Sequence, residues 1–129
     1  MPMTTEDQLA IQQLYARYNH ALDFGDTEGW ADCFTPEGVF ESATGKFEGR
    51  EQLVSFAQGF ASRMKARHWT NNLVIEEEGN GAAGKCYLLL LRLDGEGGPG
   101  IMITGVYHDS IVRADGGWRF ASRKVVGDA

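Results

Sequence analysis

Paired cysteines, basic clusters and long hydrophobic runs are all missing from this sequence. Its two cysteines, Cys33 and Cys86, lie far apart and form neither a CxxC motif nor a metal-ligand spacing, so we expect free, buried thiols. The net charge is −6 and lysines and arginines do not cluster, which argues against nucleic acid or anionic membranes as partners. No segment approaches the roughly 18 apolar residues that span a bilayer.

Sequence signals for targeting and for cofactors are also missing. The first residues, "MPMTTEDQ", lack the charged and then apolar pattern of a signal peptide, so we expect a cytoplasmic protein. The glycine-rich stretch "GEGGPG" neither follows a strand nor opens a helix as a phosphate-binding loop does. No serine or cysteine has a base at a recognisable spacing. We therefore expect no cofactor and no metal.

The composition indicates one globular unit. With 129 residues, of which 43% are hydrophobic, the chain has the length of a single domain (1–129) and enough apolar material for one core. No internal repeat or linker interrupts it.

Hydrophobic periodicity divides the chain into a helical first half and a β-rich second half. Thr5 and Gln8 fit a capping box at the start of the first helix, Gly25 ends that helix, and Asp26 caps the next. The predicted helices are residues 5–22, 27–34 and 50–64, and the predicted strands are a hairpin formed by 39–42 and 46–49, followed by 67–77, 83–93, 101–113 and 118–126. This order predicts an α+β fold, in which helices pack on one face of a curved antiparallel sheet.

Two ionisable residues stand at unusual positions, and they form either a functional pair or an incidental buried hydrogen bond. His68 opens a predicted strand that should face a core, and Asp23 lies at the C-terminal end of the first helix, where the helix dipole disfavours a carboxylate. If His68 points inward, strand alternation places Thr70, Asn72 and Val74 on the same face. The same alternation places Ile103, Gly105, Tyr107 and Asp109 together, and places His108 on the opposite face.

Four segments taken together resemble the NTF2-like superfamily, and more narrowly its SnoaL-like branch. They are "IQQLYARYNHALDFGDTEGWADCFTPEGVF", "FEGREQLVSF", "RHWTNN" and "GVYHDSIVRADGGWRF", and the resemblance extends from about residue 6 to 126. It implies a cone-shaped α+β barrel whose strongly bent antiparallel sheet is closed by three helices around a deep pocket. It also implies a homodimer formed through the outer face of the sheet.

The resemblance further implies roles for several residues. Dehydratases and a dehydrochlorinase of this superfamily pair an aspartate at the position of Asp23 with a histidine in an HxxxN context, which His68 and Asn72 match. The bile-acid 7α-dehydratase has a tyrosine at the position of Tyr18, from which a phenol can donate a hydrogen bond to a substrate oxygen. Gly105 and Tyr107 match a G-x-Y-x-(D/N) pattern, in which the glycine gives space and the tyrosine forms a wall.

A neutral imidazole paired with a carboxylate is suited to proton abstraction near pH 7. We therefore expect a cofactor-independent lyase or isomerase, similar to a dehydratase, in which Asp23, His68 and Tyr18 act on a small hydrophobic compound that bears a carbonyl. Two alternatives stay open, a polyketide cyclase of the SnoaL type and a binding protein without catalysis. The stretch "CYLLLLRL" has no second histidine or aspartate, whereas some dehydratases of the superfamily have one there. Glu41 stands in the hairpin where a ketosteroid isomerase has its base, but no oxyanion pair is evident, which argues against a steroid isomerase. The residues expected to bind substrate are Asn72, Thr70, Tyr107, Gly105, Ile103, Phe24, Trp30, Phe56 and Leu88.

Overall fold

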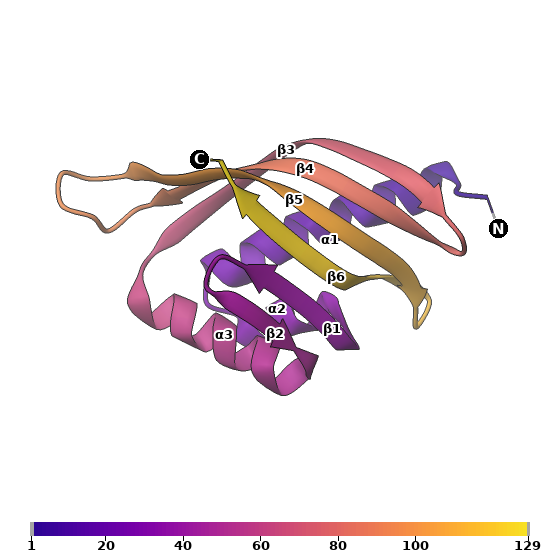
Figure 1. Cartoon of the computed structure of the whole chain (residues 1–129), viewed down its shortest axis with the longest axis horizontal. Helices are drawn as coiled ribbons and strands as arrows, with labels where there is room; N and C mark the ends of the chain where they lie inside the picture. Colours follow the sequence, from indigo (N-terminus) through magenta and orange to yellow (C-terminus); the bar gives the residue numbers. More distant parts are fainter. Residues whose placement is uncertain (1, 129) are drawn as a thin grey trace.

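The computed structural model describes residues 2–128 and has the predicted α+β architecture (Figure 1). The predicted order of elements is confirmed, with boundaries that differ by a few residues. The helices are α1 (Thr5–Asp23), α2 (Thr27–Asp32) and α3 (Gly49–Arg63), and the strands are β1 (Phe34–Ser42), β2 (Gly45–Glu48), β3 (Ala66–Glu78), β4 (Gly81–Arg92), β5 (Gly100–Ala114) and β6 (Gly117–Gly127).

Helix α1 begins with a capping box one residue earlier than predicted. The side chain of Thr4 accepts a hydrogen bond from the backbone N–H of Asp7, and the Asp7 carboxylate accepts one from the N–H of Thr4, so the predicted pair of Thr5 and Gln8 is wrong. The helix ends as predicted, because Gly25 adopts a φ of 76°, which glycine tolerates at no steric cost. Asp26 caps α2 by accepting from the N–H of Gly29 at 2.9 Å.

The six strands form one sheet in the order β2-β1-β6-β5-β4-β3. All neighbouring strands are antiparallel except β1 and β6, which run parallel, so the prediction of a fully antiparallel sheet is wrong at that pair. Strands β2 and β3 form the two edges and do not pair with each other, so the sheet is curved but not closed into a barrel. The open arrangement leaves β3 free to form one wall of a groove with a helix.

Strand β3 contains a bulge that shifts its alternation. Asn71 pairs with Tyr87 and Val74 with Lys85, so β3 has one residue more than β4 over this interval. The extra residue is accommodated at Asn72, whose φ is 56°, a conformation that asparagine tolerates better than most residues. As a result Val74 is exposed, and the prediction that it points inward with His68 is wrong.

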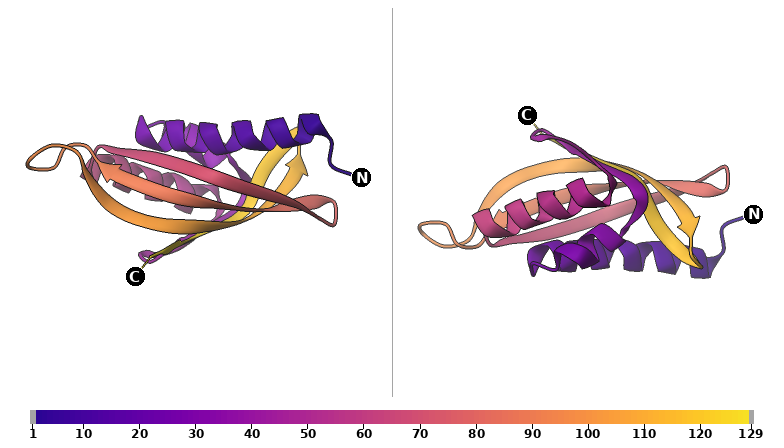
Figure 2. Two further views of the ribbon diagram at one scale, coloured as in Figure 1. Left: turned by 90° about the horizontal axis from the view of Figure 1, so that it is seen from above. Right: turned by 90° about the horizontal axis from the view of Figure 1, so that it is seen from below.

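Helices α1 and α3 contact the same sheet, α1 against β3 and β6 and α3 against β1 and β2, and the strands bend around them (Figure 2). The space between helices and sheet is filled by apolar side chains, among which aromatic rings are frequent. No helix within residues 2–128 is long and apolar enough to cross a membrane.

Candidate functional site

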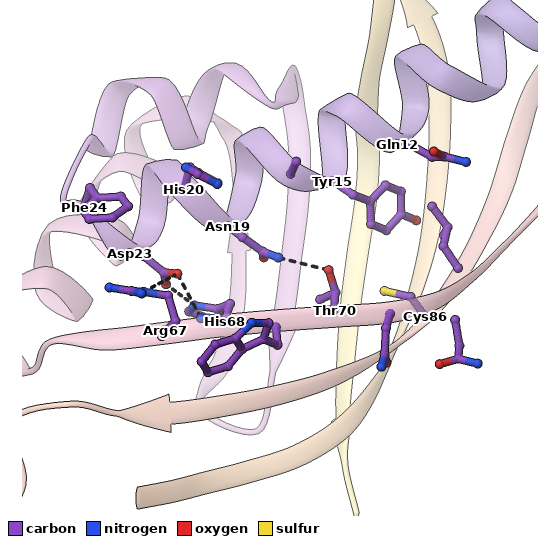
Figure 3. A pocket seen from close by; sticks show the side chains of 15 residues that line it. Gln12, Tyr15, Asn19, His20, Asp23, Phe24, Arg67, His68, Thr70 and Cys86 are labelled. Carbon is purple, nitrogen blue, oxygen red and sulfur yellow. Dashed lines mark hydrogen bonds and ion pairs between the residues drawn. The ribbon is translucent and has the colours of Figure 1, made fainter. Parts of the chain in front are cut away.

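The last residue of α1 meets the third residue of β3. One carboxylate oxygen of Asp23, Oδ1, lies 2.5 Å from Nδ1 of His68, and the other, Oδ2, accepts the backbone N–H of His68 at 3.0 Å (Figure 3). The side chains of Asp23 and His68 are 3% and 4% exposed, so water screens this contact only weakly. The two residues that the sequence singled out are thus brought together although they are 45 positions apart in the chain.

This contact determines which nitrogen of the imidazole is available for chemistry. A carboxylate is an acceptor, so in the neutral imidazole Nδ1 carries the proton and Nε2 carries the lone pair. No side chain or backbone group in residues 2–128 forms a hydrogen bond with Nε2. The ring also packs against Phe60 of α3, with 5.6 Å between the ring centroids. The histidine is therefore held in one tautomer with a free basic nitrogen.

Arg67 extends the site toward solvent. Its Nε lies 3.8 Å from Oδ2 of Asp23, and its side chain is 40% exposed. The guanidinium also lies over the ring of Phe24, 5.4 Å from the centroid, a distance typical of a cation–π contact. Asp23 is thus flanked by a histidine on the buried side and by an arginine on the exposed side.

These residues line an open groove of about 470 Å³ between α1 and β3. Five of the twelve predicted site residues line it, namely Asp23, His68, Phe24, Thr70 and Asn72. The groove is lined in full by Gln12, Tyr15, Ala16, Asn19, His20, Asp23, Phe24, Arg67, His68, Trp69, Thr70, Asn71, Asn72, Leu73 and Cys86.

The other predicted site residues do not line this groove. Tyr18, Trp30, Leu88 and Tyr107 are buried in the core, whereas Ile103 and Phe56 are partly buried against it.

The expectation that Gly105 gives space to a ligand is wrong. A Cβ at Gly105 would lie 2.6 Å from the carbonyl oxygen of Val126, so the space beside Gly105 is filled by the backbone of β6. Glycine is needed at this position for the close approach of two strands.

A second polar cluster lies in the core, and the sequence analysis did not single out its central residue, Arg123. The Arg123 Nε donates to Asp109 at 2.9 Å, both side chains are 0% exposed, and Tyr15 donates its hydroxyl to the same carboxylate at 2.5 Å. The guanidinium also lies 3.6 Å from the ring centroid of Tyr107 and 4.3 Å from that of Tyr18. Alternation predicted that Asp109 points inward, but no local pattern identified Arg123 as its partner.

The pKa values of this cluster follow from its burial. Burial raises the pKa of Asp109, against the opposing effect of the Arg123 guanidinium. Burial by itself lowers the pKa of Arg123, but the Asp109 carboxylate and the neighbouring tyrosines outweigh it, and that pKa is raised. Burial raises the pKa of the Tyr107 phenol to about 12. The pair is ionised, because the carboxylate accepts hydrogen bonds from both the Arg123 guanidinium and the Tyr15 hydroxyl.

No group of three histidine, cysteine, aspartate or glutamate side chains in the described part of the chain is arranged to hold a metal ion. The groove instead offers a paired imidazole, an arginine and several amide and hydroxyl groups. Such a set can accept a proton and bind polar atoms of an organic ligand.

Comparison with solved structures gives close matches over nearly the whole chain. Rv3472, a protein of unknown function from Mycobacterium tuberculosis, is 34% identical with a TM-score of 0.90, over 99% of this chain and 78% of that one. A protein from Catenulispora acidiphila in complex with S-DNPA is 34% identical with a TM-score of 0.86, over 97% and 96% of the two chains. A putative scytalone dehydratase from Novosphingobium aromaticivorans is 22% identical with a TM-score of 0.84, over 98% and 89%, and this likeness shows the fold alone.

No curated protein matches the chain significantly. The model of the SnoaL-like domain, in contrast, matches residues 3–124. The chain therefore belongs to the SnoaL-like family of NTF2-like proteins, as the order and spacing of its sequence motifs predicted.

Proposed function

We propose that this protein is a cofactor-independent lyase or isomerase, similar to a dehydratase, which removes a proton from a small hydrophobic substrate next to a carbonyl group. The observation that carries the proposal is the buried contact of 2.5 Å between Asp23 and His68, which leaves Nε2 without a partner beside the groove. The pair lies at a concave surface, where an imidazole held in one tautomer can meet a substrate.

The geometry supports a simple acid–base sequence. Nε2 of His68 takes a proton from the carbon next to the carbonyl, and the electron pair of that C–H bond moves toward the carbonyl oxygen as an enolate forms. The Asp23 carboxylate stabilises the imidazolium, because it already accepts the Nδ1 proton. In an elimination, the enolate then expels a hydroxyl group, which leaves as water once the imidazolium has protonated it. A base positioned in this way contributes roughly 10²- to 10⁴-fold to a rate.

Polar side chains near His68 are suited to hold the substrate. Asn72 and Thr70 line the groove on the same strand, and we propose that they bind its polar end. A direct role for Tyr18 stays a prediction, because its hydroxyl is buried in the core behind the groove.

One of the comparisons supports a role in ligand binding. The Catenulispora acidiphila protein, 34% identical to this chain, is found in complex with the compound S-DNPA. The polyketide cyclase alternative uses the same acid–base pair, so product analysis distinguishes ring closure from loss of water. A binding protein without catalysis would retain the ligand and convert none of it.

A hydrogen-exchange assay tests the proposal without knowledge of the natural substrate. A panel of aromatic and bicyclic ketones is incubated with the protein in D₂O, and deuterium incorporation next to the carbonyl is followed by NMR. We expect exchange with at least one ketone, and a decrease of about 100-fold or more in His68→Gln and Asp23→Asn. His108→Gln is the matched control, since this histidine is exposed on the opposite face of β5 and should change nothing. Equal exchange rates in all four proteins would refute the role of the pair.

We further propose that the protein is a cytoplasmic homodimer formed through the outer face of the sheet. Tyr87, Val106 and Val126 are cross-strand neighbours on β4, β5 and β6 and form an apolar row. A second copy of the chain would cover this surface on both partners at once. Light scattering of the purified protein should give twice the monomer mass of 14.2 kDa, and Tyr87→Lys should give the monomer mass. A monomeric unaltered protein at micromolar concentration would refute the dimer.

A further inference from the structure

The face of the sheet that is turned away from the helices carries three parallel rows of side chains. Along the strands these side chains alternate with the buried ones of Cys86, Tyr107 and Arg123. The middle row is the apolar row of Tyr87, Val106 and Val126. The row on one side of it consists of Lys85, His108 and Lys124. The row on the other side consists of Trp69, Leu89, Thr104 and Asp128.

The two outer rows differ in charge. Lys85 and Lys124 are exposed, and neither forms an ion pair within the described part of the chain, although Glu41 of β1 lies next to Lys124. In the opposite row Asp128 is exposed directly after β6, and its carboxylate accepts a hydrogen bond from the hydroxyl of Thr104 at 2.9 Å. A hydroxyl is neutral, so this contact does not compensate the negative charge. The face is therefore positive on one side of the apolar row and carries a carboxylate on the other.

We propose that the two copies of the dimer pack face to face about a two-fold axis that lies along the apolar row, with the strands of the two sheets antiparallel. The inference rests on the proposed homodimer and specifies its arrangement. A two-fold axis makes an interface self-complementary, so with the axis in this direction each residue of the apolar row faces its own copy and the two outer rows face each other. Lys124 then lies opposite Asp128 of the partner subunit. Packed sheets are about 10 Å apart, a gap that a lysine and an aspartate can bridge.

The charges disfavour the other directions of the axis. An axis along the strands would leave the basic row opposite itself, with Lys85 against the partner's Lys124 and His108 against the partner's His108. A diagonal axis would place either Lys85 or Lys124 against its own copy. Like charges that face each other across an interface are destabilising. Of these directions, only the axis along the apolar row pairs a lysine with a carboxylate without bringing two lysines together.

The same axis matches two exposed apolar side chains on the edge strand β3. Trp69 belongs to one outer row, whereas Val74 pairs with Lys85 and so extends the other, which places Trp69 opposite the partner's Val74. Trp69 is 52% exposed and Val74 56% exposed, and the bulge at Asn72 is what turns Val74 to this face. Trp69 also lines the groove between α1 and β3. The partner therefore supports the strand that forms one wall of the candidate site.

Charge reversal tests the arrangement through the dissociation constant of the dimer, measured by sedimentation equilibrium. Lys124→Asp should raise this constant about tenfold or more, because two attractive contacts in each dimer become repulsive. Asp128→Lys should have the same effect, and the double variant Lys124→Asp/Asp128→Lys should restore the constant of the unaltered protein. Lys85→Asp is the matched control, since Lys85 faces the partner's Leu89 and its replacement should change the constant by less than about threefold.

Two outcomes of this experiment would overturn the arrangement. A tighter dimer in Lys124→Asp or Lys85→Asp would indicate an axis along the strands, in which Lys85 and Lys124 face each other. A double variant no tighter than its single variants would show that Lys124 and Asp128 do not meet across the interface.

Cross-linking with a short bismaleimide is a second measurement, and it does not depend on charge. An equimolar mixture of Trp69→Cys and Val74→Cys, at a concentration at which the protein is dimeric, should give a linked dimer, whereas each variant alone should stay unlinked. The native cysteines are buried and should not react. A dimeric mixture that does not link, or a link in one variant alone, would overturn the arrangement and leave the homodimer and the acid–base function in place. A monomeric unaltered protein would refute the homodimer and its arrangement together, whereas deuterium exchange tests the acid–base function separately.

Discussion

Replacement of Asp109 by asparagine should destabilise the protein more than any other single loss of charge. The substitution retains the size of the side chain but removes the carboxylate that pairs with Arg123 at 2.9 Å, where both side chains are 0% exposed. Removal of one partner of a buried ion pair costs about 3–5 kcal/mol, because the other charge stays buried without compensation. Since domains of this kind are stable by about 5–15 kcal/mol, the loss is a large share of the total.

The surroundings of Arg123 place the expected loss near the lower end of that range. The guanidinium lies 3.6 Å from the ring centroid of Tyr107 and 4.3 Å from that of Tyr18, and desolvated cation–π contacts contribute up to about 2 kcal/mol. These contacts persist in the variant, and the asparagine oxygen still accepts one hydrogen bond. We therefore expect a decrease of about 3 kcal/mol in the free energy of unfolding.

Urea denaturation followed by circular dichroism measures the effect. Asp115→Asn is the matched control, because its ion pair with Arg119 is exposed and should contribute less than about 1 kcal/mol. The double variant Asp109→Leu/Arg123→Met removes both charges and should recover most of the stability lost in the single variant. A loss below about 1 kcal/mol in Asp109→Asn, or a double variant that is less stable than the single one, would refute the description of this pair as a coupled buried contact.

Two further predictions concern packing and pH. Gly84→Ala should lower the free energy of unfolding by about 1–3 kcal/mol, since the new Cβ would lie 2.1 Å from the hydroxyl of Tyr15; Gly100→Ala, where nothing lies within 4 Å, should leave thermal and urea denaturation unchanged. Hydrogen bonds from Arg113 and Thr4 hold the pKa of Asp7 below its ordinary value of 3.8, so the folded state binds this proton less readily than the unfolded state. The stability that this carboxylate contributes is present above about pH 4 and is lost as the pH falls below that value. Asp7→Asn should remove this part of the acid sensitivity in denaturation curves recorded at pH 2–7. An unchanged pH profile in the variant would contradict the prediction.

Much of the fold could be predicted because its signals are local. Helix α1 has apolar residues at spacings of three and four, and turns rich in glycine separate the last four strands. The parallel pairing of β1 with β6 could not be predicted, since it joins segments about 80 residues apart and no local pattern distinguishes it from an antiparallel pair. The bulge at Asn72 was likewise not predicted, because asparagine also fits a regular strand, and it reverses the alternation that placed Val74 inside.

In the candidate site, too, some residues could be predicted from the sequence and others could not. The contact between Asp23 and His68 was expected because each residue is unusual where it stands, one at the end of a helix and one at the start of a strand. Asn19 was not singled out, although its spacing of four from Asp23 places both on one helix face. Arg123 could not be assigned a partner, because in sequence a lone arginine in a strand resembles an exposed residue.

The two edge strands of the sheet are built in a way that discourages edge-to-edge pairing between copies of the chain. At one margin β2 is only four residues long, and at the other β3 is interrupted at Asn72 and ends in three glutamates. An edge strand that is short, bulged or acidic does not present a continuous row of free amides and carbonyls to a strand of another chain. Both edges of this sheet therefore disfavour the growth of fibres. The bulge at Asn72 that interrupts this edge strand also lies in the part of β3 that lines the groove.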